Sequence, residues 1–169
     1  MTGEAGPVQL RAATAADEDL LCRIYASTRE AELALVDWSP EQKQSFVRQQ
    51  FHAQDAYYRQ HYPGAEFWVI ERAGEALGRL YLHHRPREIR LMDIALLSVA
   101  RGNKIGEGLL RGLMERAARE GKALTIHVEK MNRARHLYER LGFVVVADRG
   151  IYDFLEWRPP NAPPGAAPG

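Results

Sequence analysis

Cysteine is almost missing from this chain: Cys22 is the single one among 169 residues. One thiol cannot form a disulfide within the chain, and it excludes a structural zinc site built from several thiolates. No stretch approaches the ~18 consecutive apolar residues that suggest a membrane-spanning helix, and the N-terminus lacks the pattern of a secretory signal. We therefore expect a cytoplasmic protein with no membrane partner.

An excess of charge of one sign is missing too. Lys and Arg number 23, Asp and Glu number 22, and the two signs alternate along the chain rather than forming blocks. A formal net charge of +1 supplies no basic face, so we expect no nucleic-acid partner. The six histidines form no cluster, and the adjacent pair His83 and His84 would point to opposite faces of a strand. We therefore expect no metal site.

What the chain does contain is the hydrophobic pattern of one mixed α/β domain. Hydrophobic residues make up 46% of the sequence, enough for a core without disulfides or metals. Strand-like segments and amphipathic helices follow one another with turn residues between them. We expect strands at residues 8–12, 67–71, 77–84, 88–97, 124–128, 143–147 and 151–157, and helices at 15–28, 40–62, 105–120 and 132–141. The segment 31–38 stays undecided.

The domain boundaries follow from the same pattern. The predicted elements fill residues 8–157, which we take as the single domain, and the strands between residues 67 and 97 favour an antiparallel meander. Residues 1–7 and the Pro/Ala/Gly-rich residues 158–169 are predicted to be disordered.

The most informative stretch leads from an apolar strand through a turn into a helix. It runs through Arg101, Gly102, Asn103, Lys104, Ile105 and Gly106. Such a turn forms an anion site, because the unpaired N–H groups of the helix start point outward and the helix dipole adds partial positive charge. Gly106, Gly108 and Gly112 each cost about 1 kcal/mol inside a helix relative to alanine, which suggests close approach of backbone or ligand. The alternative is a plain strand–helix unit whose glycines serve helix packing.

A second constellation lies in the segment 132–143. Ala134, Tyr138, Gly142 and Phe143 follow the spacing A-x-x-x-Y-x-x-x-G-F, with Asn132 just before them. Ala134 and Tyr138 are one helical turn apart and so share a face. The same residues also fit an amphipathic helix in which Tyr138 is a core aromatic.

Together, the turn and this segment resemble motifs A and B of the GNAT N-acetyltransferase superfamily. In motif A, Q/R-x-x-G-x-G/A, the residues Arg101, Ile105 and Gly106 match, whereas Lys104 stands where the family most often has glycine. In motif B, N-x-x-A-x-x-x-Y-x-x-x-G-F, the match runs from Ala134 onward, and Asn132 sits one residue too close. The resemblance extends over residues 8–157.

The resemblance implies an α/β fold with a mostly antiparallel central sheet of about six to seven strands and about four flanking helices. Strands 88–97 and 124–128 would splay apart. The pantetheine arm of the co-substrate acetyl-CoA would lie between them, paired with the backbone of Ile94, Ala95 and Leu96. The turn would hold the pyrophosphate, with Asn132 and Tyr138 completing the cofactor site and no metal involved. The sequence itself also suggests a bulge in this strand. Apolar residues occupy every second position, and near residues 92–93 this alternation shifts by one residue, as an inserted residue would cause.

Acetyl transfer to an amine needs a base, a donor to the oxyanion, and a proton or hydrogen bond for the leaving thiolate. By resemblance, Tyr138 serves the thiolate. The base stays open between three groups and water. Asp93 is a lone acid in an apolar run, where burial would raise its pKa, and His127 has an ordinary pKa of about 6.5. Glu129 is the third candidate, and a water chain the fourth.

The predicted function is therefore transfer of an acetyl group from acetyl-CoA to a primary amine of a small molecule or peptide, by direct attack in a ternary complex. A non-catalytic CoA-binding or partner-binding module of the same fold is the alternative. Helix 40–62 and segment 31–38 are expected to form the acceptor wall, and a homodimer is compatible with the sequence. The aromatics of this region fit the acceptor wall or, alternatively, core and lid packing: Trp38, Phe51, Tyr57, Tyr58 and Tyr62.

Overall fold

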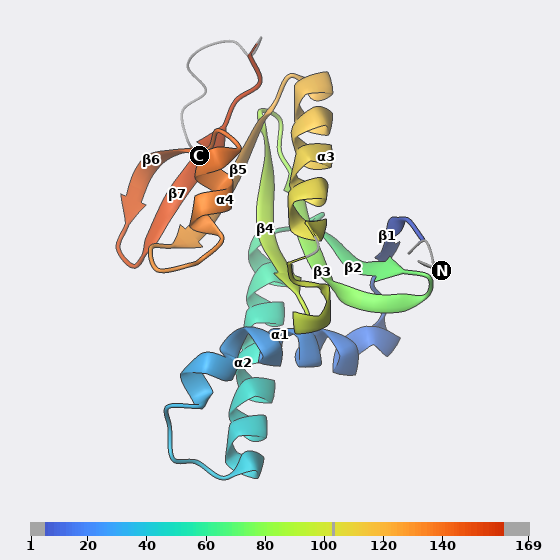
Figure 1. Ribbon diagram of the computed structural model, residues 1–169, viewed down its shortest axis with the longest axis vertical. Coiled ribbons are helices and arrows are strands. Elements are labelled where there is room, and N and C mark those ends of the chain that lie inside the picture. Colours follow the sequence, from blue (N-terminus) through green and yellow to red (C-terminus); the bar gives the residue numbers. More distant parts are fainter. Residues whose placement is uncertain (1–5, 103, 161–169) are drawn as a thin grey trace. The chain divides into compact units, whose positions relative to one another are not determined.

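The computed structural model describes residues 6–102 and 104–160 (Figure 1). The strands are β1 (Val8–Ala12), β2 (Glu66–Arg72), β3 (Glu75–His84), β4 (Glu88–Leu96), β5 (Ala123–Glu129), β6 (Val144–Arg149) and β7 (Tyr152–Trp157). The helices are α1 (Glu18–Leu33), α2 (Pro40–His61), α3 (Ile105–Glu120) and α4 (Arg135–Arg140), with short 3₁₀ turns at Ala15–Asp17 and Ser98–Ala100. In this part of the chain no helix is both long and apolar enough to cross a membrane.

One sheet holds the strands in the order β1-β2-β3-β4-β5-β7-β6. β1 pairs antiparallel with β2, and β7 pairs antiparallel with both β5 and β6. β4 and β5 are parallel, and their ladder matches Glu88–Leu91 with Ala123–Ile126. β4 runs on from there to Leu96. The expected mixed α/β fold with a mostly antiparallel sheet is confirmed, and the structure adds the parallel pairing of β4 with β5.

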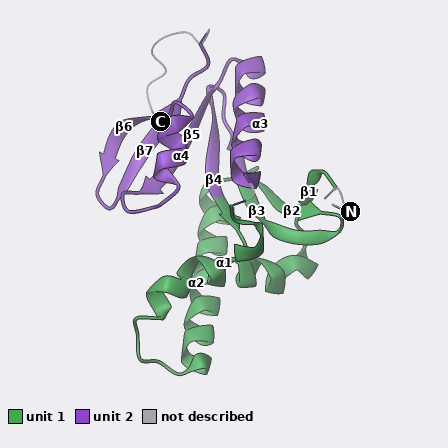
Figure 2. Ribbon diagram, viewed as in Figure 1, with its two compact units in different colours: residues 1–81, 94–103 green, residues 82–93, 104–169 purple. Residues whose placement is uncertain are grey.

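The chain forms two compact units, through both of which β3 and β4 pass (Figure 2). Unit 1 contains residues 1–81 and 94–103, and unit 2 contains residues 82–93 and 104–169. In unit 1, α1 and α2 pack on each other, and the predicted start of α2 is confirmed. The Ser39 hydroxyl accepts from the Gln42 N–H at 3.1 Å, the Gln42 side chain accepts from the Ser39 N–H at 2.9 Å, and Pro40 follows the cap.

Unit 2 is built around α3 and β5. The apolar stripe of α3 buries Leu110, Leu113 and Ala117, and β5 buries Leu124 and Ile126. α3 ends at Gly121, whose φ of +66° closes the helix in the left-handed conformation that glycine adopts without steric cost. This C-cap was predicted from the sequence.

Three helix boundaries differ from the expectation by three residues or more. α1 begins at Glu18, after the 3₁₀ turn Ala15–Asp17, rather than at residue 15. α1 continues to Leu33, so the undecided segment is split between its last turn and a loop. Here Arg29 pairs with Glu32 at 3.1 Å on the helix surface. The helix expected at 132–141 begins only at Arg135, because the Asn132 side chain accepts from the Ala134 N–H at 2.8 Å and so holds a turn before it.

The predicted terminal segments lie partly outside the described residues, which leave out 1–5 and 161–169. At the C-terminal end, Arg158 forms an ion pair with Glu156 at 2.6 Å, and Pro159 is buried.

Candidate functional site

The loop before α3 carries the predicted anion-binding turn. In unit 1, Arg101 is exposed, and its Nε donates to the Leu96 carbonyl at 2.9 Å, which ties the loop to the end of β4. In unit 2, Lys104 stands at the N-cap of α3 with φ +59° and ψ +19°, a left-handed conformation uncommon for residues other than glycine. Asn103, a predicted cofactor-binding residue, lies outside the described residues.

The start of α3 presents the features of an anion site. The first helical bond shown runs from the Gly108 N–H to the Lys104 carbonyl at 3.0 Å, so the preceding N–H groups, those of Ile105, Gly106 and Glu107, are helix-start donors. Lys104 is exposed beside them, and the helix dipole adds its positive end. This arrangement suits a pyrophosphate.

The surroundings of the glycines in α3 distinguish between helix packing and the close approach of a ligand as the reason for them. A Cβ atom placed on Gly108 or Gly112 would meet no atom of the described protein within 4 Å. Packing within the described chain therefore does not require glycine at either position. Their bare surface remains available to a ligand.

Tyr138 lies on α4 and is 3% exposed. Its ring packs edge-on against Phe143 at 5.4 Å between centroids. Burial raises the pKa of the Tyr138 hydroxyl well above its usual value, and the negative charge of Asp93 raises it further. The phenol therefore stays protonated at neutral pH and is available as a hydrogen-bond donor.

α4 is held from two sides within unit 2. Arg140 at its end pairs with Glu107 in the first turn of α3 at 3.1 Å. At its start, Arg135 pairs with the buried Asp153 of β7 and with Glu139 on α4 itself. These pairs fix the helix that carries Tyr138 relative to the start of α3. The sequence contained no signal for them, since the partners come from separate elements.

The three candidate bases have different surroundings. Asp93 on β4 is half-buried and acts electrostatically on Tyr138. The His127 ring lies against Phe154 at 4.6 Å between centroids. Its pKa is lowered, first by desolvation and then by the positive charges of Arg90 and Arg149. Glu129, at the end of β5, is exposed.

His127 thus shares its face of unit 2 with a cationic cluster that sequence reasoning missed. Arg90 is buried, its Nε donates to the Thr125 hydroxyl at 2.8 Å, and it pairs with Glu88 at 2.8 Å. Its guanidinium lies 4.8 Å from the centre of the Phe154 ring. Burial and these positive charges together favour the neutral His127 imidazole, and they also oppose the cation that a base becomes.

The predicted acyl-binding strand segment, Ile94–Leu96, belongs to unit 1 together with Gly78 of β3. A Cβ atom on Gly78 would stand 2.1 Å from the Ala95 carbonyl oxygen and 3.0 Å from the Leu96 Cα atom. Sequence reasoning missed Gly78, although a glycine inside a strand is itself a signal of close backbone approach.

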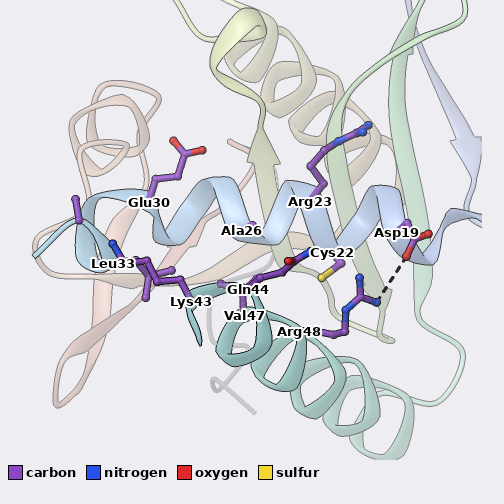
Figure 3. A pocket seen from close by; sticks show the side chains of 11 residues that line it. Asp19, Cys22, Arg23, Ala26, Glu30, Leu33, Lys43, Gln44, Val47 and Arg48 are labelled. Carbon is purple, nitrogen blue, oxygen red and sulfur yellow. Dashed lines mark ion pairs between the residues drawn. The ribbon is translucent and has the colours of Figure 1, made fainter. Parts of the chain in front are cut away.

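Unit 1 also contains a pocket of about 620 Å³ between α1 and α2 (Figure 3). Cys22 and Val47 form part of an apolar floor, and an ion pair between Asp19 and Arg48 at 3.6 Å lies at the rim. None of the predicted catalytic or cofactor-binding residues lines it. The predicted aromatics do not line it either: Phe51 is buried beside Tyr25.

No group of three or more His, Cys, Asp or Glu residues in the described ranges could hold a metal ion. Within unit 2 the candidate groups for chemistry are Tyr138, Asp93 and the start of α3, and within unit 1 the candidate is the end of β4.

Comparisons with known proteins identify a family and a shared fold. The sequence model of the acetyltransferase (GNAT) domain matches residues 34–159. None of the curated proteins compared with the chain matches it in sequence.

Solved structures share the fold. The PaiA N-acetyltransferase of Thermoplasma acidophilum, in complex with coenzyme A, is 18% identical with a TM-score of 0.68 over 90% of this chain and 99% of its own. An acetyltransferase of Corynebacterium glutamicum, described as histone acetyltransferase HPA2 and related, is 23% identical with a TM-score of 0.64 over 94% and 99%. YncA of Salmonella typhimurium, a structure with acetyl-CoA, is 22% identical with a TM-score of 0.56 over 95% and 99%. Because the family match spans well over half of the sequence, the chain belongs to the GNAT acetyltransferase family.

Proposed function

We propose that the protein is an N-acetyltransferase that moves the acetyl group of acetyl-CoA to a primary amine of a small molecule or peptide. The observation that carries the proposal is the start of α3, where helix N–H groups and an exposed Lys104 meet in a chain of the GNAT family. The donor is supported by two structural relatives that contain coenzyme A or acetyl-CoA.

In the proposed reaction the acceptor amine loses a proton to a base and attacks the acetyl carbonyl carbon. A tetrahedral oxyanion forms, and a backbone N–H of the segment Ile94–Leu96 stabilises it. The C–S bond then breaks, leaving an amide and a CoA thiolate. Asp93, His127 and water are the candidates for the base.

Tyr138 assists the departing thiolate by donating a hydrogen bond rather than by giving up its proton. A thiol has a pKa near 8.5, and the pKa of Tyr138 is raised above the ordinary phenol value near 10. Full proton transfer from this phenol to a thiolate would therefore be uphill. The donated hydrogen bond needs no such transfer, and solvent protonates the thiolate after release.

The test has two stages. Acetyl-CoA should raise the melting temperature by binding the native state; a concentration 100 times the dissociation constant corresponds to about 2.7 kcal/mol of stabilisation. Free thiol release is then followed over a panel of small amines and peptides. No stabilisation at millimolar acetyl-CoA would refute donor binding. Stabilisation without turnover of any amine would leave the CoA-binding module as the function.

A further inference from the structure

We propose that Gly78 is a positioning residue for the acyl donor: the space left by its missing side chain accepts the Ala95 carbonyl and thereby aims the Leu96 N–H at the acyl-pantetheine arm. The inference rests on the proposed function and identifies a residue that sets the geometry of its donor site. All the residues that carry it belong to unit 1.

The close approach is the first step of the argument. Gly78 is buried in the middle of β3, and any other residue would place its Cβ atom 2.1 Å from the Ala95 oxygen and 3.1 Å from the Ala95 carbonyl carbon. A carbon atom cannot stand 2.1 Å from a non-bonded oxygen. The neighbour is backbone, so no rotation of a side chain relieves the clash. Glycine is therefore required here because it has no side chain. Its backbone conformation is not the reason, because its φ lies outside the left-handed range.

The register of the strands gives the second step. The Leu97 N–H donates to the Leu77 carbonyl at 2.8 Å, which places Gly78 opposite Leu96 in the antiparallel pair. The Ala95 carbonyl is thus directed toward β3. In a trans peptide group the C=O and the following N–H point in opposite directions, and residues 6–102 and 104–160 contain no cis peptide bond. The Leu96 N–H is therefore directed away from β3.

The third step is the support around this peptide group. The Leu96 carbonyl accepts from Arg101 Nε at 2.9 Å, and Leu97 is held by Leu77. Three backbone groups, the carbonyls of Ala95 and Leu96 and the N–H of Leu97, are thus held by contacts within unit 1. Their common effect is to present the Leu96 N–H in one orientation. A preorganised N–H is the kind of donor that acyl transfer requires.

The experiment compares Gly78→Ala with Gly6→Ala, a glycine outside the candidate site at which an added Cβ meets nothing within 4 Å. Assays are run well below the melting temperature of each variant. In Gly78→Ala we expect kcat/KM for acetyl-CoA to fall about tenfold to a hundredfold, the effect of a reacting group displaced by a fraction of an ångström to one ångström. The affinity for 3′,5′-ADP, which lacks pantetheine, should stay within about twofold of wild type. Gly6→Ala should retain wild-type kinetics.

A second measurement serves if Gly78→Ala does not fold. In wild-type protein labelled with ¹⁵N-leucine, the Leu96 amide should shift and gain exchange protection when acetyl-CoA binds, whereas the Leu97 amide should be protected throughout. Wild-type kinetics in folded Gly78→Ala, or a Leu96 amide indifferent to bound acetyl-CoA, would overturn the inference. If the Leu96 amide responds to bound acetyl-CoA but no amine is acetylated, the proposed acetyltransferase function is refuted and the positioning role of Gly78 is supported. If acetyl-CoA does not bind, both the proposed function and the positioning role of Gly78 are refuted.

Discussion

Lys104 adopts a backbone conformation that favours glycine, and this predicts an unusual pattern of stability in two variants. Its φ of +59° places it in the left-handed region, which costs a residue with a Cβ atom about 1–2 kcal/mol. Lys104→Ala and Lys104→Gly both remove the ammonium group. Only the glycine variant also removes the steric cost, so the difference between the two isolates the backbone strain.

The size of the difference can be worked out. Glycine relieves about 1–2 kcal/mol of strain but loses about 0.5–1 kcal/mol because its unfolded chain is freer, which leaves a net gain of roughly 0–1.5 kcal/mol, centred on ~0.75 kcal/mol. For a protein of this size, 1 kcal/mol corresponds to about 2–4 °C in melting temperature. Lys104→Gly should therefore melt about 1–4 °C above Lys104→Ala.

Thermal unfolding without ligand measures this directly, and Lys43 supplies the control. Lys43 lies inside α2, where glycine is less favourable than alanine by about 1 kcal/mol, so the order of the two variants should reverse. If Lys104→Gly melts at or below Lys104→Ala, position 104 stores no strain and the reasoning is wrong. With CoA added, both Lys104 variants should bind more weakly and with a smaller salt dependence than wild type. Unchanged salt dependence would make Lys104 a solvated residue only.

Three further results are expected. Tyr138→Phe keeps the ring and should lower kcat, by at most the roughly 10²–10⁴-fold of general acid catalysis, with little change in acetyl-CoA affinity; full kcat with chemistry rate-limiting would leave Tyr138 a core aromatic. In pH–rate profiles of Asp93→Asn and His127→Gln, the variant that loses the rise toward higher pH while still binding CoA identifies the base, and two wild-type profiles would assign the deprotonation to water. The hydrogen bond from Arg11 lowers the pKa of Asp17 from 3.8 to about 2, so its carboxylate stabilises the fold above pH 4 and this stabilisation is lost between about pH 4 and 2. Urea unfolding of Asp17→Asn should show a flatter pH dependence in that range, and a curve that follows the wild type would contradict the assignment.

Local signals made much of the fold predictable. The capping box at Ser39, the left-handed cap at Gly121 and the apolar stripe of α3 each act over about one helical turn, so a short window of sequence contains them. The strands followed in the same way from apolar runs bounded by turn residues. The errors lie at helix ends, as at Asn132, where a side chain bonds the backbone and delays the helix.

The sequence predicted which residues belong to the candidate site, but not the surroundings that shift their pKa values. The spacing around Tyr138 predicted a helix bearing a phenol, yet its raised pKa depends first on burial and then on the charge of Asp93, which lies on β4. For His127 the sequence suggested a base with an ordinary pKa. Burial lowers that pKa first, and the charges of Arg90 and Arg149 lower it further; Phe154, which packs on the ring, and both arginines come from elements distant in the chain.

By itself, the sequence determined the family, the order of the elements, and the turn that opens α3, because each depends on residues within a few positions of one another. The tertiary structure decided that Gly78 accommodates the Ala95 carbonyl, that Arg101 holds the end of β4, and that Glu107 meets Arg140. The reason is physical: these contacts depend on strand register and helix packing. Register and packing are fixed only when separate segments bury their apolar faces together.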